Sequence, residues 1–224
     1  MEMVKCPNRR GEKIMKVILV NGSPHPKGCT HTALAEMEPI LNEAGIETEH
    51  FWIGNKPIGG CIDCRKCVET GFCIFHDRVN EFLEIAGEYS GYLFGTPVHW
   101  GASSGNMKSF MDRAFFADFC GNKGRFMFKP GACIASARRS GIVTTTDQLN
   151  RYFSLSQMPI VTSRYWDGVH GMNPDEVKQD IEGMQTMRFL ARNMIWLLKA
   201  LDIAKSNGLD FPEQEKVIFT NFIH

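Results

Sequence analysis

The chain has 224 residues, which is long enough to bury the core of one α/β domain. Its 25 basic and 25 acidic residues balance, which argues against binding to nucleic acid or to an anionic membrane surface through net charge. No apolar run reaches the roughly 18 residues of a membrane span, and no signal peptide opens the chain, so we expect a cytoplasmic protein. Eight cysteines in such a protein favour thiol, metal or redox chemistry over structural disulfides.

Residues 1–14 are polar and basic, and we expect them to form a flexible N-terminal extension. Met15 directly precedes the first apolar run, so we hypothesise that the natural chain starts there. Mass spectrometry of the native N-terminus would test this hypothesis.

Residues 17–20 predict a short buried strand, and Thr30 begins a segment with helical character. The turn between them contains no acidic residue, and Gly22 and Gly28 allow a ligand to approach the backbone closely. Free N–H groups and the positive end of a helix at such a turn suit a phosphate. Neither the NTPase loop nor the dinucleotide fingerprint is present, so an ordinary turn between strand and helix is the alternative. The excess of hydrogen-bond donors over acidic residues favours an anion, and a mononucleotide phosphate is the better hypothesis.

The later segments continue the alternation of strands and helices. Strands are predicted at 47–53, 92–94, 131–137 and 159–163, and helices at about 30–44, 77–86, 104–116, 144–156 and 174–201. Five strands alternating with five helices predict an α/β fold with a doubly wound five-stranded parallel sheet and helices on both faces. We assign this domain to residues 15–207, with a cysteine-rich loop at 57–77 and a C-terminal tail at 208–224.

Ligands of such sheets lie beyond the carboxyl ends of the strands, where the strand order reverses. Three loops follow predicted strands there, at 21–32, 96–103 and 136–141, and each is rich in Gly, Ser or Thr. We expect the first loop to hold a phosphate and the other two to hold a flat ring.

Four cysteines lie close together in the order C-x₂-C-x₂-C-x₅-C, at Cys61, Cys64, Cys67 and Cys73. Ferredoxin-type motifs open with the same spacing, so these residues are candidate ligands of a [4Fe-4S] cluster. Free thiols or a disulfide are the main alternative. Zinc ranks lower because structural zinc sites pair two C-x₂-C knuckles at greater separation.

Several of these segments resemble one known family. GSPHPKGCTHT, GTPVHWGASSGNMKSFMDR and SARRSG resemble the three flavin loops of the flavodoxin-like NAD(P)H-dependent FMN reductases. The cysteine motif and the segment from Asn173 to Thr186 are similar to those of the iron–sulfur flavoproteins. The resemblance covers roughly residues 15–202 and implies a flavodoxin-like fold with FMN as cofactor.

The resemblance assigns a part of FMN to each loop. It places the phosphate at Ser23, His25, Lys27, Gly28, Cys29 and Thr30, the isoalloxazine ring along Pro97, Val98, His99, Trp100 and Gly101, and the pyrimidine edge at Ser136, Arg138 and Gly141. Cys29 stands where Asn is common in relatives, and His99 where Tyr is often found.

The implied activity is that of an FMN-dependent oxidoreductase. NAD(P)H would give hydride to the flavin, and the electrons would pass to a small-molecule acceptor or a redox protein, through the cluster if one is present. No catalytic acid–base pair is expected, and relatives with this fold form homodimers or homotetramers. The alternatives are a flavodoxin-like electron carrier without NAD(P)H turnover, and a redox-sensing protein that binds a partner through its cysteine loop.

Overall fold

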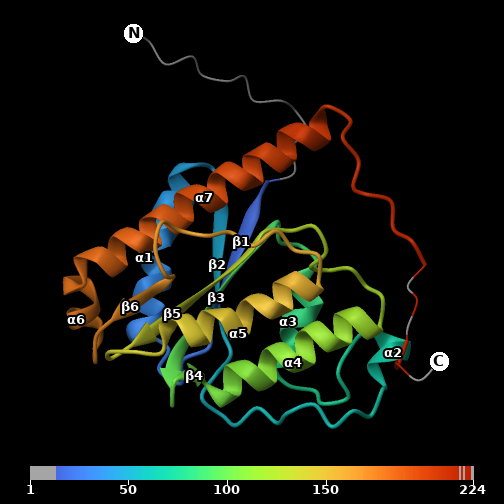
Figure 1. Ribbon diagram of the computed structural model, residues 1–224, viewed down its shortest axis with the longest axis horizontal. Helices are drawn as coiled ribbons and strands as arrows, with labels where there is room; N and C mark the ends of the chain where they lie inside the picture. Colours follow the sequence, from blue (N-terminus) through green and yellow to red (C-terminus); the bar gives the residue numbers. More distant parts are fainter. Residues whose placement is uncertain (1–13, 217, 219, 223–224) are drawn as a thin grey trace.

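The computed structural model describes residues 14–216, 218 and 220–222 (Figure 1). The predicted N-terminal extension therefore lies outside the described residues, apart from residue 14. The strands are β1 (Lys16–Asn21), β2 (Glu47–Trp52), β3 (Gly91–His99), β4 (Ala102–Ser103), β5 (Gly131–Ala137) and β6 (Gly168–His170). The helices are α1 (Cys29–Glu43), α2 (Cys67–Thr70), α3 (Arg78–Ala86), α4 (Gly105–Cys120), α5 (Ile142–Leu155), α6 (Pro174–Gln179) and α7 (Ile181–Ser206).

Five of the strands form a parallel sheet in the order β2-β1-β3-β5-β6. The order reverses between β1 and β3, as in flavodoxin-like doubly wound sheets. The predicted parallel α/β sheet is confirmed, but the count of five strands is wrong. The sixth strand, β4, is only two residues long and pairs antiparallel with the end of β3, too short a segment to show an alternating pattern.

The strand predicted at 159–163 is also wrong. This segment touches the sheet through a single bridge between Gly131 and Ile160 at the amino end of β5 and then leaves it. The outer strand is β6, which pairs with the other end of β5. A side chain at Gly168 would lie 2.6 Å from Ile142, so β6 needs a glycine that the sequence pattern counts against a strand.

Helices cover both faces of the sheet, as predicted (Figure 1). Helices α1 and α7 pack on one face around Leu34, Met37 and Met187, and α3, α4 and α5 pack on the other around Phe82, Phe110 and Phe153. The hydrophobic effect acting on these two fully buried cores fixes the sheet between them, so the loops at its edge leave a rigid base.

The long C-terminal helix predicted from residue 174 is two helices. The backbone leaves the helical conformation at Asp180, with φ −74° and ψ 79°, and the Asp180 side chain accepts a hydrogen bond from Gly183 N to cap α7. The apolar period continues across this break, which is why it predicts one helix.

Residues 208–216, which the sequence analysis assigns to a C-terminal tail, contain no helix or strand. The tail runs along one side of the molecule (Figure 1), and its Phe211 stacks on Phe128, between α4 and β5, with ring centres 4.9 Å apart. Of the helices in the described part of the chain, none is both long and apolar enough to traverse a bilayer.

Candidate functional site

The three predicted loops meet at the carboxyl edge of the sheet. The Ser104 hydroxyl donates to the carbonyl of Gly22 at 3.2 Å, which joins the first loop to the start of α4. The hydroxyls of Thr30 and Ser136 lie 2.8 Å apart and join the first loop to the third. The structure therefore brings together, from three strands, the segments that the sequence assigns to one ligand.

The first loop ends at the N-terminus of α1, whose cap residue Gly28 offers no side-chain acceptor. The first turn of α1 carries no acidic residue, so its N–H groups at residues 29–31 have no backbone or side-chain acceptor among the described residues. A side chain at Gly22 would lie 2.9 Å from Met107 Sδ and 3.0 Å from Gly95 O. Unpaired donors beside a backbone that admits no side chain fit a phosphate group.

The predicted phosphate residues divide into buried and exposed sets. Ser23 and Thr30 are buried, and Ser23 Oγ accepts a hydrogen bond from His25 N at 3.1 Å, which shapes the turn. His25 and Lys27 are exposed at the rim. Burial raises the pKa of the Cys29 thiol, and its Sγ lies 3.7 Å from the carbonyl of Gly171, so Cys29 packs as a neutral side chain.

The second loop is a tight hairpin between β3 and β4. Val98 and His99 pair with Ser103 and Ala102, and Trp100 and Gly101 form the turn with φ of 53° and 74°. Two successive positive φ angles are typical of the type I′ hairpin turn. Pro97 and Val98 are half-buried, whereas His99 is exposed and Trp100 is fully exposed at the tip.

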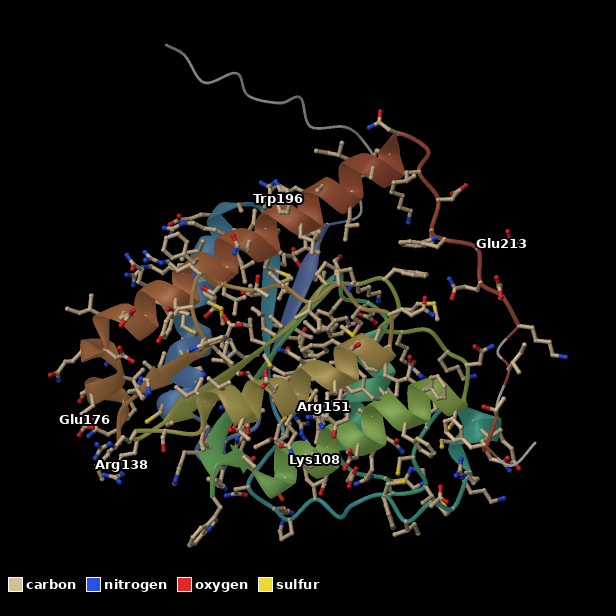
Figure 2. All side chains as sticks on the ribbon, in the orientation of Figure 1. Lys108, Arg138, Arg151, Glu176, Trp196 and Glu213 are labelled. Atoms are coloured by element: carbon tan, nitrogen blue, oxygen red, sulfur yellow. The ribbon has the colours of Figure 1, made fainter. Side chains whose placement is uncertain are left out.

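The third loop packs against this hairpin. Gly141 has φ +98°, and a side chain there would lie 2.6 Å from Val98 Cγ1 and 3.1 Å from Gly101 Cα. Ser136 is buried, whereas Arg138 is exposed and projects beyond the end of β5 (Figure 2). The second and third loops thus touch through a glycine, and the predicted ring residues border one another.

A cavity of about 350 Å³ lies behind the third loop and was missed by the sequence analysis. Its walls are the start of α5, the segment before β6 and the start of α7, and they include Arg139, Tyr165, Trp166 and His170. The sequence carries no signal for it, because the segment at 164–167 is irregular and comes into place only when β6 pairs with β5.

All four cysteines of the predicted motif line one small cavity of about 20 Å³, together with Arg65, Arg113 and Phe116. Burial, and then the neighbouring thiols of Cys120, Cys61 and Cys64, raise the pKa of the Cys67 thiol. Across residues 14–216 and the few described beyond them, no three His, Cys, Asp or Glu side chains are grouped closely enough to hold a single metal ion. A four-iron cluster spaces its thiolates farther apart than one ion does, so this all-sulfur donor set, with no acid lining the cavity, fits a cluster better than an ion.

Three neighbours of this cavity were not singled out from the sequence: Arg113, Asn80 and Cys120. Arg113 follows Phe110 and precedes Ala117 on the inner face of α4, where a charged residue among apolar ones is a signal that could have identified it. Cys120 lies outside the compact motif, so the spacing of the motif gave no reason to include it.

Comparison with known proteins shows the family to which the chain belongs. A family model for NADPH-dependent FMN reductases matches residues 15–170. An iron–sulfur flavoprotein of Methanocaldococcus jannaschii is 32% identical over 192 residues, covering 84% of this chain and 99% of the relative.

Two solved structures share the fold. RosB with bound 8-demethyl-8-formylriboflavin-5'-phosphate aligns with a TM-score of 0.66 and 14% identity over 94% of both chains. An archaeal flavodoxin aligns with a TM-score of 0.55 and 13% identity, covering 83% of this chain and 99% of the flavodoxin. The chain therefore belongs to the NADPH-dependent FMN reductase family and is an oxidoreductase with a flavodoxin-like fold, related over most of its length to an iron–sulfur flavoprotein.

Proposed function

We propose that the protein binds FMN at the three meeting loops, takes hydride from NAD(P)H and passes the electrons to a small-molecule acceptor or a redox protein. The observation that carries the proposal is the junction of these loops, where Ser104 bonds Gly22 and Thr30 bonds Ser136 beside the unpaired N–H groups of α1. The junction supports the proposal because it would unite the proposed phosphate site and ring site in a chain of the FMN reductase family.

The chain's own residues bind and orient the cofactor in this proposal. The N-terminus of α1 and Lys27 hold the phosphate, the hairpin from Pro97 to Gly101 lies along the ring, and Ser136 and Arg138 reach its pyrimidine edge. Bound FMN would supply the group that accepts hydride from NAD(P)H. No described residue needs to act as an acid–base catalyst, because position and electrostatics carry the rate.

Stopped-flow mixing of the FMN-loaded protein with NADH or NADPH tests the hydride step. We expect the flavin absorbance to bleach with at least one of the two. A flavin that stays oxidised with both would favour the electron carrier without NAD(P)H turnover, which is the second candidate function.

We further propose that Cys61, Cys64, Cys67 and Cys73 hold a [4Fe-4S] cluster, which would supply one-electron transfer. The support is that these four thiols line a single cavity beside Arg65 and Arg113, whose positive charges favour an anionic group. Iron and sulfide analysis of anaerobically purified protein tests this proposal. We expect about four of each per chain, whereas zinc without sulfide, or no metal, would contradict it.

We also propose a homodimer or homotetramer with the ring site near a subunit boundary. Fully exposed Trp100 at the tip of the ring hairpin supports this arrangement, because an isolated chain gains nothing from an exposed indole there. Light scattering of the wild-type protein and of Trp100→Ala tests it. A wild-type monomer would contradict it.

A further inference from the structure

Arg113 is the largest of the fully buried side chains, with 2% of its surface exposed. Its guanidinium makes a bidentate ion pair with Asp77, with Nη1 2.7 Å from Oδ2 and Nη2 2.9 Å from Oδ1. The third nitrogen, Nε, donates to the sulfur of Cys73 at 3.1 Å. A buried cation is costly unless it is paired, and here every edge of the guanidinium has an acceptor.

The same guanidinium ties down the cysteine loop on both sides of its motif. Nη1 donates to the carbonyl of Gly59 at 3.3 Å, before the first cysteine, and Nη2 donates to the carbonyl of Phe75 at 3.4 Å, after the last. Its Cζ atom also lies 4.9 Å from the centre of the Phe75 ring. Arg113 therefore fixes the two ends of the segment that carries all four candidate ligands.

Cys73 is held from a second direction by Asn80, which is buried on α3. The Asn80 side chain accepts from Cys73 N at 2.9 Å and donates to Cys73 O at 2.8 Å. The backbone of Cys73 is thus clamped by one residue and its sulfur by another. Cys61 and Cys64, by contrast, are exposed on the outer part of the loop.

We propose that Arg113 is a positioning residue of the cysteine site: it holds the Cys73 sulfur toward the cavity and stabilises the reduced form of the cluster bound there. The inference rests on the proposed cluster. A hydrogen bond to a ligand sulfur withdraws electron density from it, and a fixed positive charge favours the form with one more electron. Both effects raise the reduction potential.

Arg113→Gln removes the charge and the sulfur contact, and Arg113→Lys keeps the charge but loses the planar fork. The double variant Asp77→Asn/Arg113→Gln avoids leaving Asp77 unpaired if the single variant fails to fold. Arg125→Gln is the matched control. Arg125 is also largely buried, pairs with Asp118 at 3.1 Å and donates to the carbonyl of Gly71 in the same loop at 3.2 Å. Unlike Arg113, it donates to no sulfur of the described residues.

The measurements are iron and sulfide per chain after anaerobic reconstitution, and the midpoint potential from an EPR-monitored redox titration. We expect Arg113→Gln to favour the oxidised cluster about tenfold more than wild type, a shift of about 59 mV to more negative potential. The double variant should shift in the same direction by less, because it removes the negative charge of Asp77 together with the positive charge of Arg113. Arg113→Lys should show a smaller shift and a lower iron content. Arg125→Gln should keep the wild-type potential.

The inference is overturned if Arg113→Gln and Arg125→Gln have the same potential and iron content. It is also overturned if the wild-type protein binds and reduces FMN normally but takes up no iron and sulfide. In that case the flavin function stands, because flavin absorbance reports on the loops and iron content reports on the cysteine cavity.

Discussion

Arg138 is the residue through which we expect the protein to tune its flavin. It is exposed at the end of β5, two residues after the buried Ser136 (Figure 2). Within the described part of the chain, no carboxylate lies within ion-pair distance of it. Its charge is therefore available to a ligand. A cation beside the pyrimidine edge stabilises the negative charge of the reduced ring.

Arg138→Ala should consequently lower the two-electron reduction potential of bound FMN. Arg138→Lys keeps the positive charge, so its potential should stay close to that of the wild type. Dye-coupled reduction of the FMN-loaded variants measures the difference. An alanine variant with the wild-type potential would remove Arg138 from the ring site.

Asp167 gives a prediction about stability rather than activity. Its Oδ1 is buried without a hydrogen-bond partner, and burial raises the pKa of Asp167 to about 7. The folded chain thus holds a proton that the unfolded chain, with the ordinary aspartate pKa of 3.8, has lost. Between these two values the unfolded state binds fewer protons, so stability falls as pH rises from about 4 to 7 and stays lower above that range.

Asp167→Asn carries no charge at any pH and should abolish this loss. We expect the variant to gain about 1–2 kcal/mol of unfolding free energy relative to wild type at pH 8, and little or nothing at pH 4.5. Urea unfolding at the two pH values measures it. An equal effect of the substitution at both pH values would show that the carboxyl does not titrate in this window.

At the level of elements, the ring site depends on how closely the β5–α5 loop approaches the β3–β4 hairpin. Gly141 makes this approach possible because it has φ +98° and its Cα faces Val98 and Gly101. Gly141→Ala should cost about 1 kcal/mol for the left-handed backbone. It should also push the two loops apart and weaken FMN binding by about tenfold, or about 1.4 kcal/mol.

Gly45→Ala is the matched control for that experiment. Gly45 also has a positive φ, +80°, but no atom lies within 4 Å of an added side chain. The control should lose similar stability in urea and keep the wild-type dissociation constant for FMN by fluorescence titration. If both variants bind FMN equally well, contact between the two loops does not shape the site.

Helix α4 links the two sites of the molecule. Ser104, its N-cap, bonds the first flavin loop, and Arg113, nine residues later, bonds the sulfur of Cys73. Nine residues of α-helix span about 14 Å. The apolar period of the sequence predicted this helix at 104–116, after the ring loop at 96–103. The contact between Arg113, in the middle of the helix, and Cys73 was not predicted.

Over the whole molecule, the sequence predicted what depends on local pattern. Buried strands such as 17–20, helices such as 104–116, and the three loops after strands could all be read from periodicity and turn residues. The alternation of these elements, with right-handed crossovers, predicted a parallel sheet with helices on both faces.

What it missed depends on contacts between distant segments. Strand β6 forms because glycine at 168 lets the chain lie against Ile142, and the apolar run at 159–163 stays outside the sheet because it meets only Gly131. Arg113 and Asn80 reach Cys73 across 40 and 7 residues. Such pairings leave no period in the sequence, so only the folded chain reveals them.

The central claim is that three loops at one edge of the sheet bind FMN, and titration of the flavin-free protein with FMN, followed by quenching of flavin fluorescence, tests it most directly. We expect one FMN per chain with a dissociation constant at or below about 1 μM, and a weaker constant for Gly141→Ala than for Gly45→Ala. A wild-type protein that leaves the fluorescence of micromolar FMN unchanged would contradict the account.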